Sequence, residues 1–388
     1  MKVILVNTIA GEGSTGVIVD GIARGLKERG DEVYVCSSRG ASNVVDTGHS
    51  LHIGSATSRV THALMTRLTD RHALHSSIPT FKLIHFIDRI EPDVVHLHNL
   101  HGYYLDLPLL MKYLRATRIP TVLTLHDCWT MTGHCTYPTL AGCKKYADAT
   151  CSECPLKGEY PRSIWFDRSR ENVMMKRRLL EDFEQLYITA VSPWMADVVH
   201  SSWLCKHPIY TIENGIDESI FHPFEDIKPK RQVLAVANVW TEMKGFEDLL
   251  RVKDMLPEGY TLTVVGANRR QRAMLGDGVQ TYQRVTQREL AKIYAESAVT
   301  LNLSRAESFG MTVLESIACS TPVVSYSNSA VERTIPPSRG ILIEDKDVTA
   351  IAPAIERATR LPRMSVAKDV RTAEDMTRDY LCLYDNLI

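Results

Sequence analysis

The sequence lacks a long apolar run, an imbalance of charge and any extended block of like charge. No run of 18 apolar residues occurs, so we expect no hydrophobic helix that spans a membrane. The 45 lysines and arginines nearly balance 46 aspartates and glutamates, and the formal net charge of −1 argues against a nucleic-acid-binding protein. The opening residues, MKVILVNTIAGEG, hold an apolar run too short for a signal peptide and better suited to a first strand. We therefore expect a cytoplasmic protein, with peripheral contact at the inner face of the cell membrane left open.

The composition is that of an ordinary globular protein, since 44% of the residues are hydrophobic. The length of 388 residues suggests two domains. Short apolar runs alternate with helical patterns, as in a parallel sheet whose strands are buried on both faces. The runs lie at 3–7, 32–36, 93–97, 121–125 and 187–191, and then, after a proline-containing segment, at 233–239, 261–265, 299–303 and 322–326. We predict an α/β protein with two Rossmann-like, doubly wound domains facing a cleft. Their predicted bounds are 1–215, with a cysteine-rich insertion at 128–160, then 216–370, and a C-terminal helix at 371–388 that could pack back on the first domain. The polar, basic stretch 268–278 is predicted to be a loop.

The segment RAESFGMTVLESIACS, residues 305–320, places Glu307 and Glu315 at the start of a helical pattern. The free amides of a first helical turn bind anions, and Gly310 would let a ligand approach the backbone closely. A sugar diphosphate fits such a site, with its phosphates on the helix start and its hydroxyls on the two carboxylates. Spacing alone favours the plainer reading, in which both glutamates are solvated and the helix dipole stabilises the first.

Several segments together resemble one enzyme family. ESFGMTVLESIACSTPVV resembles the E-x7-E region of the retaining, GT-B-fold glycosyltransferases of glycosyltransferase family 4. AGEGSTGVIVDGIARGLKERGDEV, ENGID and MKGFEDLL resemble further family segments in the family's order, and DVVHLHNLHGYYL with TVLTLHDCWTMTGHC resembles a subgroup that builds colanic acid and other bacterial surface polysaccharides. The resemblance covers nearly the whole chain. It implies retaining transfer of a sugar from a nucleotide-diphosphate sugar to a saccharide acceptor, expected to be lipid-linked, with no cofactor or metal needed for catalysis.

The resemblance also assigns roles to residues. It implies that Glu315 binds the ribose hydroxyls, Glu307 the hydroxyls of the sugar, Lys244 the diphosphate and His126 the transferred sugar, and that Gly16 approaches the donor phosphate or the acceptor. Glu307, His126 and Lys244 are the predicted catalytic residues. The predicted donor-binding set is Gly16, Asn238, Lys244, Ser308, Phe309, Gly310, Met311, Thr312 and Glu315. Other histidines also follow predicted strands, where active sites of open α/β sheets gather: His96, His98, His101 and His134.

The sequence departs from the family pattern at one place. An arginine usually stands five or six residues before the lysine of the K-G segment, and Val239 and Asn238 occupy those positions here. Arg269 or Arg270 could compensate, and Lys244 could instead be purely structural. The missing arginine keeps a non-catalytic sugar-nucleotide-binding module open as an alternative, and a GT-B epimerase or phosphorylase is another. DKD at 345–347 looks like the metal motif of a different glycosyltransferase fold, but we expect a solvated turn there.

Four of the nine cysteines have metal-ligand spacing. Cys135, Cys143, Cys151 and Cys154 form C-x7-C-x7-C-x2-C. In a cytoplasmic chain this favours thiolates on a metal, and a closed structural zinc site could hold the insertion in place beside His126. Free buried thiols and disulfides are the alternatives.

Residues 57–90 combine basic and apolar side chains. Val60, Leu64 and Leu68 fall on one face at helical spacing, with Arg59 and Arg67 beside it. The wider set is Arg71, Lys82 and Arg89 with Leu74, Phe81, Leu83, Ile84 and Phe86. A lipid-linked acceptor would need a membrane-facing surface, and each basic residue near anionic lipid contributes about 1 kcal/mol. Alternatively, the apolar residues pack on the sheet and the arginines are solvated.

Overall fold

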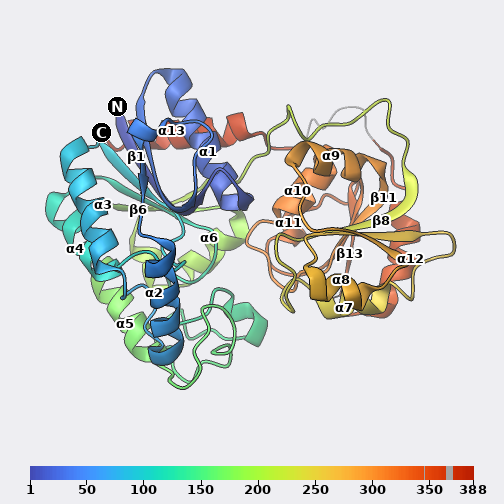
Figure 1. Cartoon of the computed structure of the whole chain (residues 1–388), viewed down its shortest axis with the longest axis horizontal. Helices are drawn as coiled ribbons and strands as arrows, with labels where there is room; N and C mark the ends of the chain where they lie inside the picture. The colour runs from blue at the N-terminus through green and yellow to red at the C-terminus, as the bar shows by residue number, and fades with distance from the viewer. Residues whose placement is uncertain (345, 364–369) are drawn as a thin grey trace. The chain divides into compact units, whose positions relative to one another are not determined.

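A computed structural model describes residues 1–344, 346–363 and 370–388, so Asp345 of the DKD sequence lies outside the described residues (Figure 1). The chain divides into two compact units, each described here by itself. The first unit contains Met1–Glu213 and Glu374–Ile388, and the second contains Asn214–Ala373. In the described part of the chain, no helix has both the length and the apolar character needed to cross a bilayer.

The first unit is built on a seven-stranded parallel sheet with strand order β3-β2-β1-β4-β5-β6-β7. Its strands are β1 (Lys2–Ala10), β2 (Glu32–Gly40), β3 (Ser50–His52), β4 (Val94–Leu97), β5 (Thr121–Leu125), β6 (Leu186–Ala190) and β7 (Ile209–Thr211). Its helices are α1 (Gly13–Arg29), α2 (Ala56–Thr69), α3 (Ser77–Ile90), α4 (Leu107–Thr117), α5 (Ser169–Leu180), α6 (Pro193–His200) and α13 (Ala373–Asp385), with 3-10 turns at Thr47–His49, Pro138–Ala141 and Trp203–Lys206. The five longer strands match the predicted apolar runs. The sequence reading missed β3 and β7, which are edge strands of only three residues.

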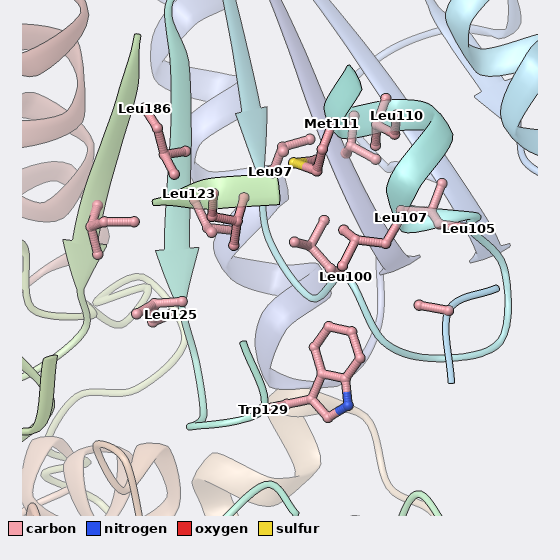
Figure 2. Packing of buried hydrophobic residues seen from close by; sticks show 14 of the residues in the cluster. Leu97, Leu100, Leu105, Leu107, Leu110, Met111, Leu123, Leu125, Trp129 and Leu186 are labelled. Carbon is pink, nitrogen blue, oxygen red and sulfur yellow. The ribbon is translucent and has the colours of Figure 1, made fainter. Parts of the chain in front are cut away.

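Side chains on the two faces of this sheet enter different cores, as the alternation along a strand requires. Ile4 and Val6 of β1 join the large cluster under α3 and α4, while Val3 and Leu5 join the cluster formed with α1 and α13. Figure 2 shows part of the larger cluster, where leucines of the sheet meet the apolar side of α4 and Trp129 lies beyond the strand ends. The near-continuous apolar strands are therefore explained by burial on both faces.

Helix α13 belongs to the first unit although it lies at the other end of the sequence. Figure 1 shows it in red beside the blue α1. A β-carbon on Gly25 of α1 would lie 2.0 Å from Cγ2 of Thr377, so the two helices are in close contact here and a side chain at position 25 would displace Thr377. Tyr384 is buried and its hydroxyl lies 2.6 Å from Nδ1 of His96 on β4.

The second unit has a six-stranded parallel sheet with strand order β10-β9-β8-β11-β12-β13. Its strands are β8 (Lys230–Val236), β9 (Thr261–Val265), β10 (Val279–Tyr282), β11 (Ser297–Asn302), β12 (Val323–Tyr326) and β13 (Gly340–Ile343). Its helices are α7 (Phe246–Val252), α8 (Arg269–Leu275), α9 (Gln287–Glu296), α10 (Met311–Ala318), α11 (Val331–Thr334) and α12 (Ile351–Ala358), with a 3-10 turn at Val348–Ala350. The two Rossmann-like units confirm the predicted fold class.

The predicted loop at 268–278 is wrong, because residues Arg269–Leu275 form α8. Asn268 caps the helix by accepting from the amide of Gln271, and the side chain of Gln271 accepts from the amide of Asn268. This reciprocal capping box stabilises a short helix that has little apolar surface. The N-x-x-Q spacing was the signal in the sequence, and its polar composition concealed it.

Residues 57–90 form two helices that bury part of the predicted membrane surface. Leu83 and Phe86 lie in the core, so the prediction that they belong to an exposed surface is wrong. They pack on the sheet because they share one side of α3 with its other buried residues. By contrast, Val60 and Leu64 on α2 are 68% and 51% exposed.

Candidate functional site

The two glutamates of segment 305–320 lie on either side of the start of α10. Glu307 is buried in the loop between β11 and α10, and Glu315 lies on the second turn of the helix. Lys244, in the turn that connects β8 to α7, places its Nζ 2.5 Å from Oε1 of Glu307. The lysine and glutamate side chains are 27% and 11% exposed, so the ion pair can still be reached by a ligand.

Two glycines fix the backbone around this ion pair. Gly245, directly after Lys244, has φ of +75°, and a β-carbon there would lie 2.3 Å from the carbonyl oxygen of Leu303. The lysine turn therefore packs against the end of β11 through its bare backbone. Gly310 has φ of +94° and directly precedes α10 at the N-cap position, where it has no side chain to cap the helix. The amides of Met311 and Thr312 in the first turn are thus placed to receive an anion.

Glu315 occupies a largely apolar environment. Its Oε2 accepts a hydrogen bond of 3.1 Å from the hydroxyl of Tyr294 on α9. Burial raises the pKa of Glu315 to about 7, because removing a carboxylate from water disfavours its charged form, and the Tyr294 hydrogen bond offsets this only in part. A ligand that donates hydroxyl groups to this carboxylate would restore the lost solvation.

Asn238 lies exposed in the loop after β8, at a position where the resembled family has arginine. Helix α8 comes close to this loop, because Nε2 of Gln271 donates to the carbonyl oxygen of Trp240 at 2.9 Å. Arg269 and Arg270 are exposed on the first turn of α8. The second unit therefore presents two arginines near the loop that lacks the expected one.

The remaining predicted donor-binding residues complete the same loop. Phe309 is buried, and its carbonyl oxygen accepts from the hydroxyl of Thr334 at 3.0 Å, which anchors the loop before α10. Ser308 is half-buried between Glu307 and Phe309. The second unit thus brings together Lys244, Glu307, Ser308, Phe309, Gly310, Met311 and Thr312, with Glu315 one turn along the helix.

In the first unit, His126 lies at the end of β5 in a row of histidines. Its Nε2 is 3.0 Å from Nδ1 of His98, and the two rings stack with centroids 5.3 Å apart. His98 in turn lies against His96, with ring centroids 4.1 Å apart. Burial lowers the pKa of His126 to about 4, so the ring is neutral at pH 7 and offers one hydrogen-bond donor and one acceptor.

The next residue along the chain forms a second polar cluster that the sequence reading missed. Asp127 Oδ2 lies 2.7 Å from Nε2 of His101, and Nδ1 of His101 lies 3.1 Å from the hydroxyl of Tyr160. Burial by itself would raise the pKa of Asp127. The charge of His101 and hydrogen bonds from His101 and from the amide of Trp129 outweigh burial, so the pKa of Asp127 is lowered. The sequence signals were the aspartate directly after His126 and the histidine after β4, but Tyr160 lies too far along the chain to be paired with them by spacing.

Gly16 also belongs to the first unit, on the first turns of α1. It is buried, and a β-carbon there would lie 3.3 Å from backbone atoms of Ile9, Ala10 and Gly11. The visible role of Gly16 is therefore to let α1 pack closely on the end of β1. Its predicted contact with a donor or acceptor stays a prediction.

The four spaced cysteines all line one small cavity of about 20 Å³ in the segment between β5 and α5. All nine cysteines of the chain are free thiols. A hydrogen bond between Cys135 and Cys154 lowers the pKa of the Cys154 thiol to about 6. Over residues 1–344, 346–363 and 370–388, no group of three or more His, Cys, Asp or Glu side chains is placed to hold a metal ion, and the predicted zinc site stays a prediction.

Comparison with known proteins gives relatives among glycosyltransferases. WcaC of Escherichia coli (strain K12), a protein named for glycosyl transfer in colanic acid biosynthesis, is 24% identical over 319 residues, which cover 76% of this chain and 77% of that protein. D-inositol 3-phosphate glycosyltransferase of Paenarthrobacter aurescens (strain TC1) is 36% identical over 107 residues, which cover 27% of this chain and 24% of that protein.

Solved structures show the same fold over the full chain. Sucrose-phosphate synthase from Thermosynechococcus elongatus has a TM-score of 0.71 at 16% identity, covering 100% of this chain and 98% of that one. Anabaena Alr3699/HepE in complex with UDP-glucose has a TM-score of 0.68 at 13% identity, with 100% of both chains covered. WaaG, a glycosyltransferase involved in lipopolysaccharide biosynthesis, has a TM-score of 0.65 at 14% identity, covering 99% of this chain and 97% of that one.

Two family models together span most of the sequence. The model described as Glycosyl transferases group 1 matches residues 217–374, and the model described as Glycosyltransferase Family 4 matches residues 15–220, over half of the chain. The chain therefore belongs to Glycosyltransferase Family 4 and is a glycosyltransferase of GT-B fold, as its motifs predicted.

Proposed function

We propose that this protein is a retaining glycosyltransferase that moves a sugar from a nucleotide-diphosphate sugar to a saccharide acceptor in bacterial surface polysaccharide biosynthesis. The observation that carries the proposal is the Lys244–Glu307 ion pair beside the uncapped start of α10, with Glu315 on the next turn. The naming of WcaC for colanic acid biosynthesis and of WaaG for lipopolysaccharide biosynthesis supports the pathway class. The HepE complex with UDP-glucose supports a nucleotide-sugar donor.

The ion pair suggests how donor binding would rearrange the site. Glu307 pairs with Lys244. A diphosphate at the amides of Met311 and Thr312 would bring a second anion to the ammonium, and Lys244 would then pair with phosphate. Glu307 would be released to accept hydrogen bonds from the sugar hydroxyls. Glu315 would accept from the ribose hydroxyls.

The transfer step needs positioning more than a protein nucleophile. The acceptor hydroxyl oxygen forms a bond to C1 of the sugar on the face that the diphosphate leaves, and the C1–O bond to phosphate breaks. The departing phosphate oxygen takes the acceptor's proton, so no catalytic metal is required by this route. The protein's contribution is orientation and the stabilisation of charge on the leaving diphosphate.

Arg269 and Arg270 are the residues we propose as replacements for the missing family arginine. They lie on the first turn of α8, which Gln271 joins to the loop that holds Asn238. If the missing arginine instead marks a non-catalytic binding module, UDP would bind but neither transfer nor slow donor hydrolysis would be measurable.

The test is calorimetric titration of UDP and UDP-sugars into the full chain, paired with a transfer assay. Glu315→Gln should weaken UDP binding, whereas Glu307→Gln should keep UDP binding and lose transfer. Glu258→Gln, at an exposed position away from α10, is the matched control. Wild-type affinity and transfer in both variants would remove the proposed site.

We further propose that the acceptor is lipid-linked and that the first unit touches an anionic bilayer. The exposed face of α2, with Val60 and Leu64, is joined to a second apolar element, because the amide of Ile164 donates to the carbonyl oxygen of Arg67 at 2.9 Å. In that element Trp165 is 69% exposed. The exposed basic residues of the same segments are Arg67, Arg71 and Arg162. Together they match a surface that combines apolar insertion with attraction to anionic headgroups.

Liposome co-sedimentation distinguishes this surface from a merely solvated one. Binding should require anionic lipid, fall with salt and weaken in Arg67→Ser/Arg71→Ser and in Trp165→Ala. Arg59 is left unchanged, since its guanidinium donates to the carbonyl oxygen of Ser38. Lys112→Ser/Arg115→Ser, at two exposed positions of α4, is the charge-matched control. No binding, or binding that salt does not change, contradicts the proposal.

A further inference from the structure

The segment between β5 and α5, residues 126–168, is long and almost without regular structure. Its only element is the 3-10 turn Pro138–Ala141. Chain segments of this length rarely hold one conformation without an additional constraint. Cys135, Cys143, Cys151 and Cys154 come from separate parts of the segment and line one cavity of about 20 Å³, room for a single atom the size of water or an ion.

The backbone around this cavity donates hydrogen bonds to sulfur. The amide of Gly133 lies 3.3 Å from Sγ of Cys151, and the amide of Leu156 donates to Cys154. Cys135 and Cys154 are hydrogen-bonded to each other. Two of the four sulfur atoms, those of Cys151 and Cys154, thus already have a backbone donor directed at them.

A buried lysine lies beside the cysteines. Lys176 of α5 is buried, and its Nζ donates to the carbonyl oxygens of Trp129 and Thr132 at 2.6 and 2.9 Å. Burial lowers the pKa of Lys176 to about 7, and the nearby Cys151 and Cys135 act against that shift. An ion held by four thiolates would carry a net negative charge, and Lys176 would offset part of it.

We propose that this cavity binds one structural zinc ion through the thiolates of Cys135, Cys143, Cys151 and Cys154. Four thiolates around one point are the ligands of closed structural zinc sites, with Zn–S distances of about 2.3 Å. Because the thiols line the cavity without yet forming a coordination shell, binding would draw them inward. The ion would have no open position and would take no part in sugar transfer.

The zinc site would position the polar cluster of the first unit. The segment that it constrains contains Asp127 and Tyr160, and both of these residues contact His101. Loss of the ion should therefore disturb this cluster while leaving UDP binding at the second unit unchanged. This consequence rests on the proposed function, whereas metal content can be measured without it.

The first test is metal analysis of the full chain purified without chelator. We expect about one zinc per chain, loss of zinc in Cys151→Ser and full retention in Cys205→Ser, an exposed cysteine outside the cluster. Chelation should lower the melting temperature of the wild type. Wild-type protein that carries no zinc and takes up none on incubation with Zn²⁺ overturns the proposal, as do disulfides within the cluster or iron in place of zinc.

A second test fixes the fourth ligand and does not depend on variants that might fail to fold. His134 lines the same cavity, its Nδ1 lies 2.6 Å from Oδ1 of Asp70, and its buried Nε2 has no partner among the described residues. In the wild type with Co²⁺ substituted for zinc, the visible spectrum should be that of four sulfur ligands. A spectrum of three sulfurs and one nitrogen overturns the assignment of Cys143.

Discussion

Replacing Glu315 should make the second unit more stable and, at the same time, weaken its binding of a nucleotide. Burial raises the pKa of Glu315 from an ordinary 4.5 to about 7. Between pH 4.5 and pH 7, the folded protein therefore keeps a proton on Glu315 that the unfolded chain has released. Stability therefore falls as pH rises from about 4.5 to 7, because the folded state binds more protons than the unfolded state. At 1.36 kcal/mol per pKa unit, the charged carboxylate destabilises the second unit by about 3 kcal/mol above pH 7.

The variant Glu315→Gln keeps the shape and removes the charge. At pH 8 we expect it to be more stable than the wild type by up to about 3 kcal/mol, and at pH 4.5 we expect the two to be nearly equal. The same variant should lose UDP affinity at pH 8. In the wild type, UDP affinity should rise between pH 6 and pH 8, because a carboxylate accepts ribose hydroxyls better than its protonated form does.

Differential scanning calorimetry suits this test, because a two-unit chain need not unfold in one step. Trp240 is the only tryptophan of the second unit, so its fluorescence change can assign the transition of that unit. Glu258→Gln controls for the loss of an exposed charge. The reasoning is refuted if Glu315→Gln changes stability equally at pH 4.5 and pH 8, or if it stabilises the unit and leaves UDP affinity intact.

Three other substitutions test separate contacts. Lys244→Met removes the cation paired with Glu307, and titration calorimetry should show UDP affinity reduced at least tenfold; unchanged affinity would make Lys244 structural. Gly245→Ala places a β-carbon 2.3 Å from the carbonyl oxygen of Leu303 at positive φ, so the second unit should lose more than about 1 kcal/mol in calorimetry, and a stability equal to the wild type would contradict the close packing. Asp127→Asn removes the charge that faces His101, and transfer should fall while UDP binding is kept; equal transfer rates would show that this cluster serves structure alone.

The fold could be predicted because its strands are buried on both faces and therefore read as apolar runs. Strands β3 and β7 were not predicted, because edge strands of three residues contain too few apolar residues to form a recognisable run. Helix α8 was not predicted for a different reason. The capping box of Asn268 and Gln271 stabilises it, and it has no apolar stripe that the sequence would reveal. Leu83 and Phe86 were misplaced because an amphipathic pattern says that one face is buried but does not say against what.

The anion site of the second unit could be predicted from the sequence, whereas the polar cluster of the first unit could not. The reason is that the contacts of the anion site join residues close in sequence, and those of the polar cluster join residues far apart in sequence. The anion site of the second unit is formed mainly by one short stretch of sequence. A glycine, a helix start and the two carboxylates that flank that start are defined by local geometry, and only Lys244 comes from another segment. The polar cluster of the first unit joins His101, Asp127 and Tyr160 from three separate segments, and no local spacing relates them. Tyr160 contacts His101 because the segment after β5 folds back on the first unit. The same folding brings the four cysteines around one cavity. The cysteine spacing is therefore the one local signal in the sequence for a long-range arrangement, and metal analysis tests the constraint on which the position of Tyr160 would depend.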